Sequence, residues 1–155
     1  MIAATEIGLA FPADAHAIAM MSRDHIEQGL RWSWSAARVR NAIADRETNV
    51  IVARQAGVIV GFALMKYGDE AAHLLLLGVA PRLRRKGTAT ALIDWLEATL
   101  RTAGVAIVQV EVRESNAVAR AFYAERGYEQ VGATRGYYQG VETALCLVKE
   151  LGPRK

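Results

Sequence analysis

A basic loop is the part of this sequence best suited to bind an anion. Four Arg and Lys residues stand between an apolar run and an amphipathic stretch, in the segment Arg82-Leu83-Arg84-Arg85-Lys86-Gly87-Thr88-Ala89. Backbone N–H groups at a helix start have no partner within the helix, and the helix dipole adds positive character there. A strand, a basic turn with glycine and a helix start therefore predict a phosphate-binding site. The alternative is a solvated surface turn, as most charge runs are.

The charge balance locates the basic excess in this loop. The chain has 19 Lys and Arg residues against 16 Asp and Glu residues, a net charge of +3. Without Arg82, Arg84, Arg85 and Lys86 the count is 15 against 16, a net charge of −1. A local anion site fits this distribution better than a generally cationic surface. A net charge of +3 is also too small to predict nucleic-acid binding.

An acid and a phenol on consecutive predicted elements could transfer protons. Glu111 lies near the carboxyl end of a predicted strand over residues 105–112. Open α/β sheets place their ligands at such strand ends, so Glu111 is a candidate general base. Tyr123, beside Phe122 on the following helix, is a candidate proton donor. The alternatives are a solvated acid or a partner of Arg113 for the first residue, and a packing role for the second.

Hydrophobic spacing and turn residues predict the elements that position these side chains. In chain order we expect helices at 12–23 and 24–45 (one or two), strands at 50–54, 58–65 and 72–79, a helix at 87–103, a strand at 105–112, a helix between Ser115 and Gly127, and strands at 128–131 and 141–148. The leucines of the third strand predict burial on both of its faces. This order indicates an α/β (α+β) fold, a mixed sheet of about six to seven strands with helices on both faces. The strand–helix–strand step over residues 72–112 predicts a parallel crossover at the basic loop.

Polar residues and glycines mark the predicted helix ends. Ser33 or Ser35 could cap the second N-terminal helix, and Gly104 is a natural stop for the helix at 87–103. We expect Ser115 to cap the helix that carries the phenol. Asn116 could contact a ligand or cap that helix itself.

Length and composition limit the class of protein. We expect a single domain over residues 1–155, because 155 residues with 52% hydrophobic and 23% charged residues are typical of one globular unit. The apolar runs are too short for a membrane span, and residues 1–11 lack the basic start of a secretory signal. Cys146 is the only cysteine, which favours a reducing cytoplasm. The three histidines share no metal-ligand spacing with it, so we expect no metal.

Two ordered sets of residues resemble the GNAT acetyltransferase superfamily. Arg84-Arg85-Lys86-Gly87-Thr88-Ala89 resembles its R/Q-x-x-G-x-G/A signature. Residues 110–116 and 121–128 resemble the segment that follows, above all in the branch of ribosomal-protein-alanine N-acetyltransferases. The later Arg-x-Tyr-Tyr of that branch is present as Arg135-Gly136-Tyr137-Tyr138. The resemblance covers about residues 50–148, and the N-terminal third departs from that branch.

The resemblance implies a site for acetyl-CoA as co-substrate. The pyrophosphate would bind the backbone N–H groups of residues 85–90, and the pantetheine would run along a strand edge. The implied acetyl-CoA residues are Leu77, Gly78, Val79, Arg84, Arg85, Lys86, Gly87, Thr88, Ala89, Thr90 and Asn116. Glu111 would act as the base through water, and Tyr123 would protonate the departing thiolate. The amine would attack the thioester directly, with no covalent enzyme intermediate.

The resemblance implies a primary amine as the acceptor. The resemblance around Glu111 and Tyr137-Tyr138 favours a protein N-terminal α-amine, whose pKa of about 7.7–8.0 demands little of a base. A small amine or amino-acid-like metabolite is the first alternative, because the substrate-side helices lie in the poorly matching N-terminal third. A CoA-binding partner protein without turnover is the second, and the presence of both Glu111 and Tyr123 speaks against it. We expect no nucleic-acid or membrane partner, and a monomer or homodimer.

Overall fold

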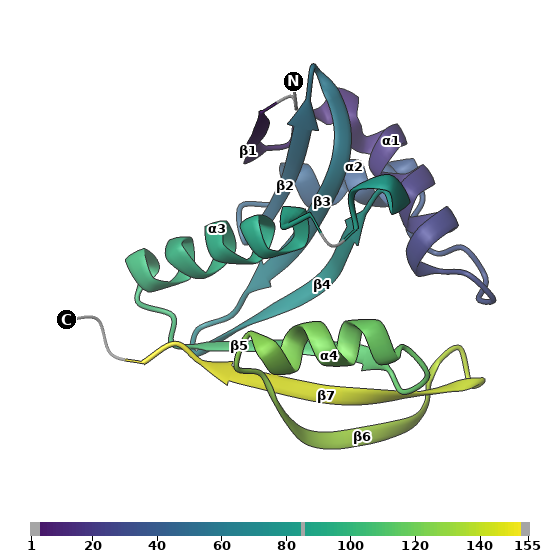
Figure 1. The fold of residues 1–155 in the computed structure, drawn as a ribbon, viewed down its shortest axis with the longest axis vertical. Coiled ribbons are helices and arrows are strands. Elements are labelled where there is room, and N and C mark those ends of the chain that lie inside the picture. The colour runs from purple at the N-terminus through teal and green to yellow at the C-terminus, as the bar shows by residue number, and fades with distance from the viewer. Residues whose placement is uncertain (1–3, 85, 153–155) are drawn as a thin grey trace.

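Seven strands form one mixed sheet in the order β1-β2-β3-β4-β5-β7-β6 (Figure 1). The computed structural model describes residues 4–84 and 86–152. The strands are β1 (Thr5–Leu9), β2 (Thr48–Gln55), β3 (Val58–Tyr67), β4 (Ala71–Val79), β5 (Ile107–Arg113), β6 (Glu129–Tyr138) and β7 (Glu142–Glu150). All neighbours pair antiparallel except β4 and β5, which are parallel. The predicted parallel crossover at the basic loop is therefore confirmed.

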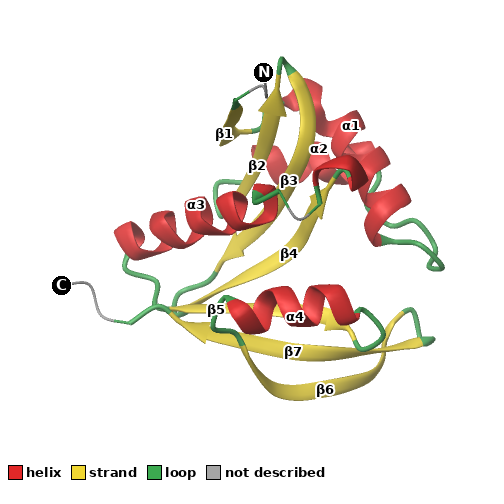
Figure 2. Cartoon of the chain, viewed as in Figure 1, coloured by secondary structure: helices red, strands yellow, loops and turns green. Residues whose placement is uncertain are grey.

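Helices cover both faces of the sheet, as expected (Figure 2). The helices are α1 (Ala15–Met21), α2 (Ala36–Ala44), α3 (Thr88–Ala103) and α4 (Ala117–Glu125), with single turns η1 (Pro12–Asp14), η2 (Ser22–Ile26) and η3 (Pro81–Leu83). One apolar cluster joins α3 and α4 to one face of the sheet. A second cluster joins α1 and α2 to the other face, over β2, β3 and β4. The fold class predicted from the sequence is confirmed.

Helix ends follow the expected residues in α2 and α3. Ser35 caps α2, because its hydroxyl accepts a hydrogen bond from the Arg38 N–H at 3.2 Å. Gly87 and Gly104 flank α3 with φ of 85° and 79°, a left-handed conformation that glycine adopts without strain. Four buried side chains form the core-facing stripe of α3, namely Leu92, Ile93, Leu96 and Leu100.

Two sequence-based expectations, about the first strand and about the cap of α4, were incomplete or wrong. The strand β1 was not expected, because its residues are largely exposed and it is held by pairing with β2 rather than by its own apolar pattern. The cap of α4 is Asn116 and not Ser115: the Asn116 side chain accepts from the Ala119 N–H at 3.0 Å. The Ser115 hydroxyl instead donates to Glu142 on the neighbouring hairpin.

The strand β4 is not buried on both faces, and the reason is the course of the strand itself. Residues 71–74 pair with 107–110 of β5, and no pairing is recorded for the part of β4 beyond Leu74. A register shift against β3 at the same point leaves Leu75 without a partner there. Such a bulge bends a strand, and Figure 1 shows β4 and β5 diverging. Leu75 and Leu77 are only half-buried, and both line a cavity at this point.

Candidate active site

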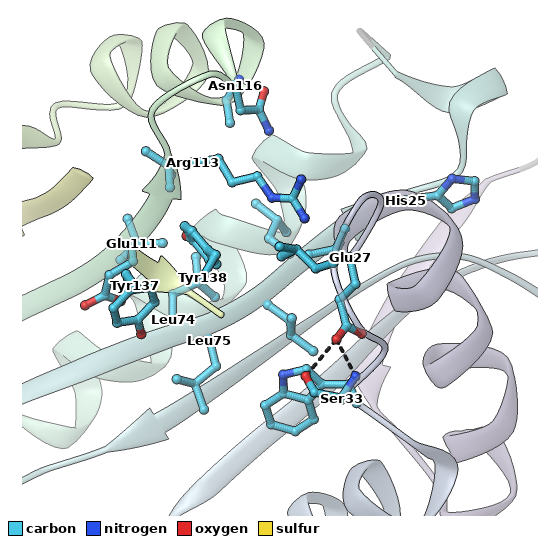
Figure 3. A pocket seen from close by; sticks show the side chains of 18 of the residues that line it. His25, Glu27, Ser33, Leu74, Leu75, Glu111, Arg113, Asn116, Tyr137 and Tyr138 are labelled. Carbon is cyan, nitrogen blue, oxygen red and sulfur yellow. Dashed lines mark hydrogen bonds between the residues drawn. The ribbon is translucent and has the colours of Figure 1, made fainter. Parts of the chain in front are cut away.

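A cavity of about 450 Å³ opens where β4 and β5 part. The two strands supply its floor through residues 74–77 and 110–113. The loop after η2 supplies one wall, the end of β6 with the turn that follows it supplies the opposite wall, and α4 supplies one end. Figure 3 shows Glu111, Tyr137 and Tyr138 on one side of this cavity and Glu27 with Ser33 on the other. The divergence of two parallel strands thus creates an opening that both Glu111 and Tyr123 line.

Glu111 lines the cavity and is held at both carboxylate oxygens. Gln109 Nε2 donates to Glu111 Oε1 at 3.0 Å, and His73 Nε2 contacts Glu111 Oε2. The side chain is 13% exposed. Burial alone would raise the pKa of Glu111, but the hydrogen bonds from His73 and Gln109 outweigh it and the pKa lies below the usual value. Glu111 is thus a carboxylate at neutral pH, partnered by a histidine and not by Arg113.

Tyr123 approaches the same cavity from the other face of β5. It packs in the core formed by α4 and the apolar face of β5, with its ring edge-on to Phe122 and to Tyr128 at 5.2 Å each. Burial raises the pKa of Tyr123 far above its ordinary value, so the phenol keeps its proton. The residue is a packing side chain and also part of the cavity wall. Its role as a proton donor stays a prediction.

The basic loop lies where β4 leads through η3 into α3. The α3 N-cap is Gly87, which offers no side chain to the first backbone N–H groups, in contrast to Ser35 and Asn116 at α2 and α4. Arg84 and Lys86 are exposed at this end of the helix. Arg85 lies outside the described residues. Free helical N–H groups beside two exposed cations are the arrangement that anions bind.

The remaining predicted acetyl-CoA residues occupy different environments. Thr88 is buried at the start of α3, while Ala89 and Thr90 are half-buried. On β4, Leu77 lines the cavity and Val79 faces the core. Gly78 lies against β3, where an added Cβ would stand 2.7 Å from Phe62 Cε1, so close packing requires a glycine there.

The loop after η2 carries a buried acid that the sequence did not single out. Glu27 Oε1 accepts from the N–H and the hydroxyl of Ser33, each at 2.7 Å, and Oε2 accepts from the Ser22 hydroxyl at 2.8 Å. Nearby, Arg113 donates to the Gln28 carbonyl at 2.6 Å, so it ties β5 to this loop and is not the simple surface charge that its type suggests. The only available signal was the presence of serines on both sides of Glu27.

Asn116 and His73 complete the surroundings of the cavity. Asn116 lines the cavity while its side-chain oxygen caps α4, so a cofactor contact would have to use its amide nitrogen. His73 was considered from the sequence only as a metal ligand. It contacts Glu111 because β4 and β5 place His73 beside Gln109 in register, and a register of parallel strands cannot be read from a single sequence.

Similarity to known proteins identifies the family. The profile described as "Acetyltransferase (GNAT) domain" matches residues 20–143. The chain belongs to the GNAT acetyltransferase family. It is 33% identical to the [Ribosomal protein bS18]-alanine N-acetyltransferase of Escherichia coli (strain K12) over 127 residues, 79% of this chain and 85% of that protein. The resemblance stated from the sequence is confirmed, and the chain is an N-acetyltransferase.

Solved structures of GNAT proteins share the fold. The ribosomal-protein-S18-alanine N-acetyltransferase from Escherichia coli superposes with a TM-score of 0.78 at 27% identity, covering 98% of this chain and 97% of that one. Ard1 from Thermoplasma volcanium gives 0.87 at 24% identity, covering 96% and 99%. The PaiA N-acetyltransferase from Thermoplasma acidophilum, solved in complex with coenzyme A, gives 0.82 at 20% identity, covering 95% and 99%.

A metal site and a membrane-spanning helix were also sought in the described parts of this GNAT chain. No group of three or more His, Cys, Asp or Glu side chains is arranged there to hold a metal ion. No described helix combines the length and the apolar character that a membrane crossing requires. The expected absence of a metal stays a prediction.

Proposed function

We propose that this GNAT domain, over residues 1–155, transfers the acetyl group of acetyl-CoA to the N-terminal α-amine of a protein. The observation that carries the proposal is the composition of the cavity at the β4–β5 divergence. There Glu111 lies with Tyr137 and Tyr138 from the end of β6. The similarity to an alanine N-acetyltransferase over most of the chain supports the same acceptor class.

The donor would bind along the divergence, from the start of α3 to the cavity. The uncapped N–H groups after Gly87, with Arg84 and Lys86 beside them, would hold the pyrophosphate. Arg85, which stands between these two cations in the sequence, is proposed to contribute as well. Backbone groups of Leu77, Gly78 and Val79 would take the pantetheine, because this end of β4 has left β5. The side-chain amide of Asn116 would contact the donor from the start of α4. Thr88, Ala89 and Thr90 contribute through their backbone.

Two side chains would handle the protons of a direct transfer. Glu111, ionised at neutral pH, would accept a proton from the acceptor ammonium through a water molecule. Tyr123, protonated because it is buried, would donate to the sulfur as the thioester bond breaks. The two groups reach the cavity from opposite faces of β5, so the base stands on the acceptor side and the acid on the other side of the opening.

A small amine is the second candidate acceptor, and one observation favours it. The cavity of about 450 Å³ falls within the usual range of small-ligand pockets. Its acceptor side is also narrowed by the loop after η2, which is linked to the β6–β7 turn through Gln139 and Arg31. A peptide would have to enter end-on.

A competition between acceptors tests the proposal. The enzyme is incubated with acetyl-CoA and one acceptor at a time. The peptide acceptors are a hexapeptide that begins with alanine and contains one lysine, and the same peptide blocked at its N-terminus. The small acceptors are ethanolamine and free alanine. We expect thiol release with the unblocked peptide alone and, by fragmentation mass spectrometry, one acetyl group on its first residue. Faster turnover of a small amine would replace the proposal with the second candidate. Acetyl-CoA binding without any turnover would indicate a non-catalytic CoA-binding protein.

The cellular location and the partners are proposed from the sequence alone. A cytoplasmic location fits a chain with Cys146 as its only cysteine. We propose a monomer or homodimer acting on an amine, without a nucleic-acid or membrane partner.

A further inference from the structure

Trp34 and Arg38 form a stacked pair on the acceptor side of the cavity. Both residues line the cavity, and Ser33, just before Trp34, lies across it from Glu111 (Figure 3). The Ser35 cap begins α2 between the two, and the first turn of the helix brings Arg38 over the half-buried indole. The Arg38 Cζ atom lies 3.7 Å from the centre of the Trp34 ring. So short a separation leaves no room for an edge-on guanidinium, so the two planar groups are stacked.

Arg38 is the cavity arginine whose charge has no described partner. The other arginine of the lining, Arg113, donates to the Gln28 carbonyl and lies 3.7 Å from a carboxylate oxygen of Glu142. Among the described residues, no carboxylate oxygen lies within 4.0 Å of an Arg38 side-chain nitrogen. The first turn of α2 contains no acid either. The positive charge of Arg38 is therefore left for a ligand.

Glu27 lines the same wall but does not neutralise Arg38. Its carboxylate oxygens accept hydrogen bonds from the Ser22 hydroxyl at 2.8 Å and from the N–H and hydroxyl of Ser33 at 2.7 Å. Glu27 is buried, while Arg38 is exposed. This wall thus combines an acid whose hydrogen bonds are made within the protein with a cation whose hydrogen bonds are not.

A stacked guanidinium is well suited to bind a carboxylate. Its five N–H donors lie in the plane of the group and point past the edge of the ring beneath it. A carboxylate accepts two of these hydrogen bonds in parallel, and the opposite charges strengthen both. Stacking also orders the long arginine side chain in advance, so less entropy is lost when a ligand binds. The pair of Trp34 and Arg38 therefore favours an anionic group in the acceptor.

We propose that Trp34 and Arg38 form a carboxylate subsite that selects acceptor proteins with an acidic side chain at their second residue. With the α-amine beside Glu111, the next residue advances about 3.3–3.6 Å along the chain, and its side chain would reach the opposite wall. A free α-amino acid has its amine and carboxylate on one carbon and would not span from Glu111 to that wall. The inference rests on the proposed function, because it takes the α-amine of a protein as the acceptor.

Three amidated hexapeptides test the preference. They begin with Ala-Asp, Ala-Asn or Ala-Lys, are otherwise identical and contain no other charged side chain. We expect kcat/KM to be about fivefold or more higher for Ala-Asp than for Ala-Asn, and lowest for Ala-Lys, because the subsite attracts one charge and repels the other. The advantage of Asp should shrink at high salt, since Arg38 is exposed. Equal kcat/KM values for the three peptides would overturn the subsite and leave the proposed function standing.

Substitutions on α2 separate Arg38 from the general charge of the protein. Arg38→Gln should abolish the preference for Ala-Asp over Ala-Asn, and Arg38→Glu should make Ala-Lys the best of the three substrates. Arg40→Gln, at an exposed position on the same helix and outside the described cavity lining, is the control and should keep the wild-type order. A full preference for Ala-Asp in Arg38→Gln would overturn the assignment. Unchanged circular dichroism verifies that each variant is folded.

Calorimetry detects the subsite without turnover. The enzyme is saturated with coenzyme A, which has no acetyl group to transfer, and each peptide is titrated into it. The Ala-Asp peptide should bind about fivefold more tightly than the Ala-Asn peptide in the wild type, and equally in Arg38→Gln. Binding that depends on Arg38, with no peptide acetylated by acetyl-CoA, would overturn the proposed function and retain the subsite. Absence of both the binding preference and acetylation would overturn both.

Discussion

Arg31 and Gln139, 108 residues apart in the sequence, exchange two hydrogen bonds. The Arg31 N–H donates to Gln139 Oε1, and Gln139 Nε2 donates to the Arg31 carbonyl, each at 2.6 Å. One side chain thus joins the loop after η2 to the β6–β7 turn. Both segments line the cavity, so this pair sets the distance between its acceptor-side walls.

Loss of the Arg31–Gln139 hydrogen bonds should weaken binding of the acceptor and leave binding of acetyl-CoA unchanged. Gln139→Ala removes both hydrogen bonds, which contribute about 1 kcal/mol each. We expect the KM for the alanine hexapeptide to rise roughly three- to tenfold, because the two walls must be ordered anew when the peptide binds. Steady-state kinetics with each substrate varied in turn provide the measurement. Gln130→Ala, at an exposed site elsewhere on β6, should leave both KM values unchanged. An equal rise in the acetyl-CoA Kd would contradict this interpretation.

The start of α3 can be tested with a matched pair of substitutions. Gly87 has φ of 85° and an added Cβ meets no atom within 4 Å, so Asn and Asp fit equally and share the same small strain. We expect Gly87→Asp to abolish detectable acetyl-CoA binding, because its charge would face the pyrophosphate, and Gly87→Asn to retain most of it. Isothermal calorimetry on both variants decides. Equal affinities for the two would remove this loop from the acetyl-CoA site.

The phenol of Tyr123 should matter to the chemical step. Tyr123→Phe keeps the ring packing, and we expect kcat to fall about a hundredfold or more with little change in acetyl-CoA affinity. Tyr128→Phe is the control. Its hydroxyl bonds the buried Glu97 at 3.0 Å, so its loss should cost about 1–3 kcal/mol of stability and leave kcat intact. Single-turnover rates that are normal in Tyr123→Phe would leave Tyr123 a packing residue like Phe122.

The defect of Glu111→Gln should depend on pH. Burial raises the pKa of Glu111, but its hydrogen bonds outweigh this effect and lower the pKa. The wild-type carboxylate is therefore ionised throughout the range from pH 6 to 9. The pH dependence then reflects the acceptor, whose ammonium needs a base below its pKa of about 8 and none above it. We expect kcat/KM to fall about a hundredfold at pH 6.5 and less than about tenfold at pH 9. A constant ratio to wild type across this range would exclude a general-base role.

Acid should unfold the protein partly through Asp14. Burial raises the pKa of Asp14, but hydrogen bonds from Arg54 at 2.5 Å and the Phe11 N–H at 2.7 Å hold it below the ordinary 3.8. A carboxyl with a depressed folded pKa stabilises the fold above its unfolded pKa, and that contribution vanishes as pH falls through the folded value. Urea unfolding should show Asp14→Asn about 1–3 kcal/mol less stable than wild type at pH 7, with the difference shrinking below pH 4. A pH-independent difference would contradict the assignment.

Local patterns in the sequence predicted the elements that carry the proposed donor site. The spacing of Leu92, Ile93, Leu96 and Leu100 defines α3, and glycines at both ends define where it starts and stops. The position of Glu111 on the face of β5 away from the core also followed from strict alternation along one strand. Such features depend on neighbours in the chain, so a single sequence contains them.

Contacts between distant segments were beyond the sequence. The partnership of His73 with Glu111 depends on the register of β4 against β5, and the Arg31–Gln139 link depends on where two loops meet. The leucines of β4 were expected to be buried on both faces because the pattern shows apolar character but not where a neighbouring strand leaves. The acceptor side of the cavity consists largely of such contacts, which is why it was the least predictable part.

The four residue pairs that join β4 to β5 are the only pairing between two halves of the described sheet. Within the described sheet, β1 to β4 lie on one side of it with the start of α3, and β5, β7 and β6 lie on the other with Glu111 and Tyr123. A donor bound across the divergence would contact both halves of the sheet and stabilise their association. Acetyl-CoA at 100 times its Kd would add about 2.7 kcal/mol to the free energy of unfolding. The substrate would then also stabilise the fold of the enzyme that consumes it.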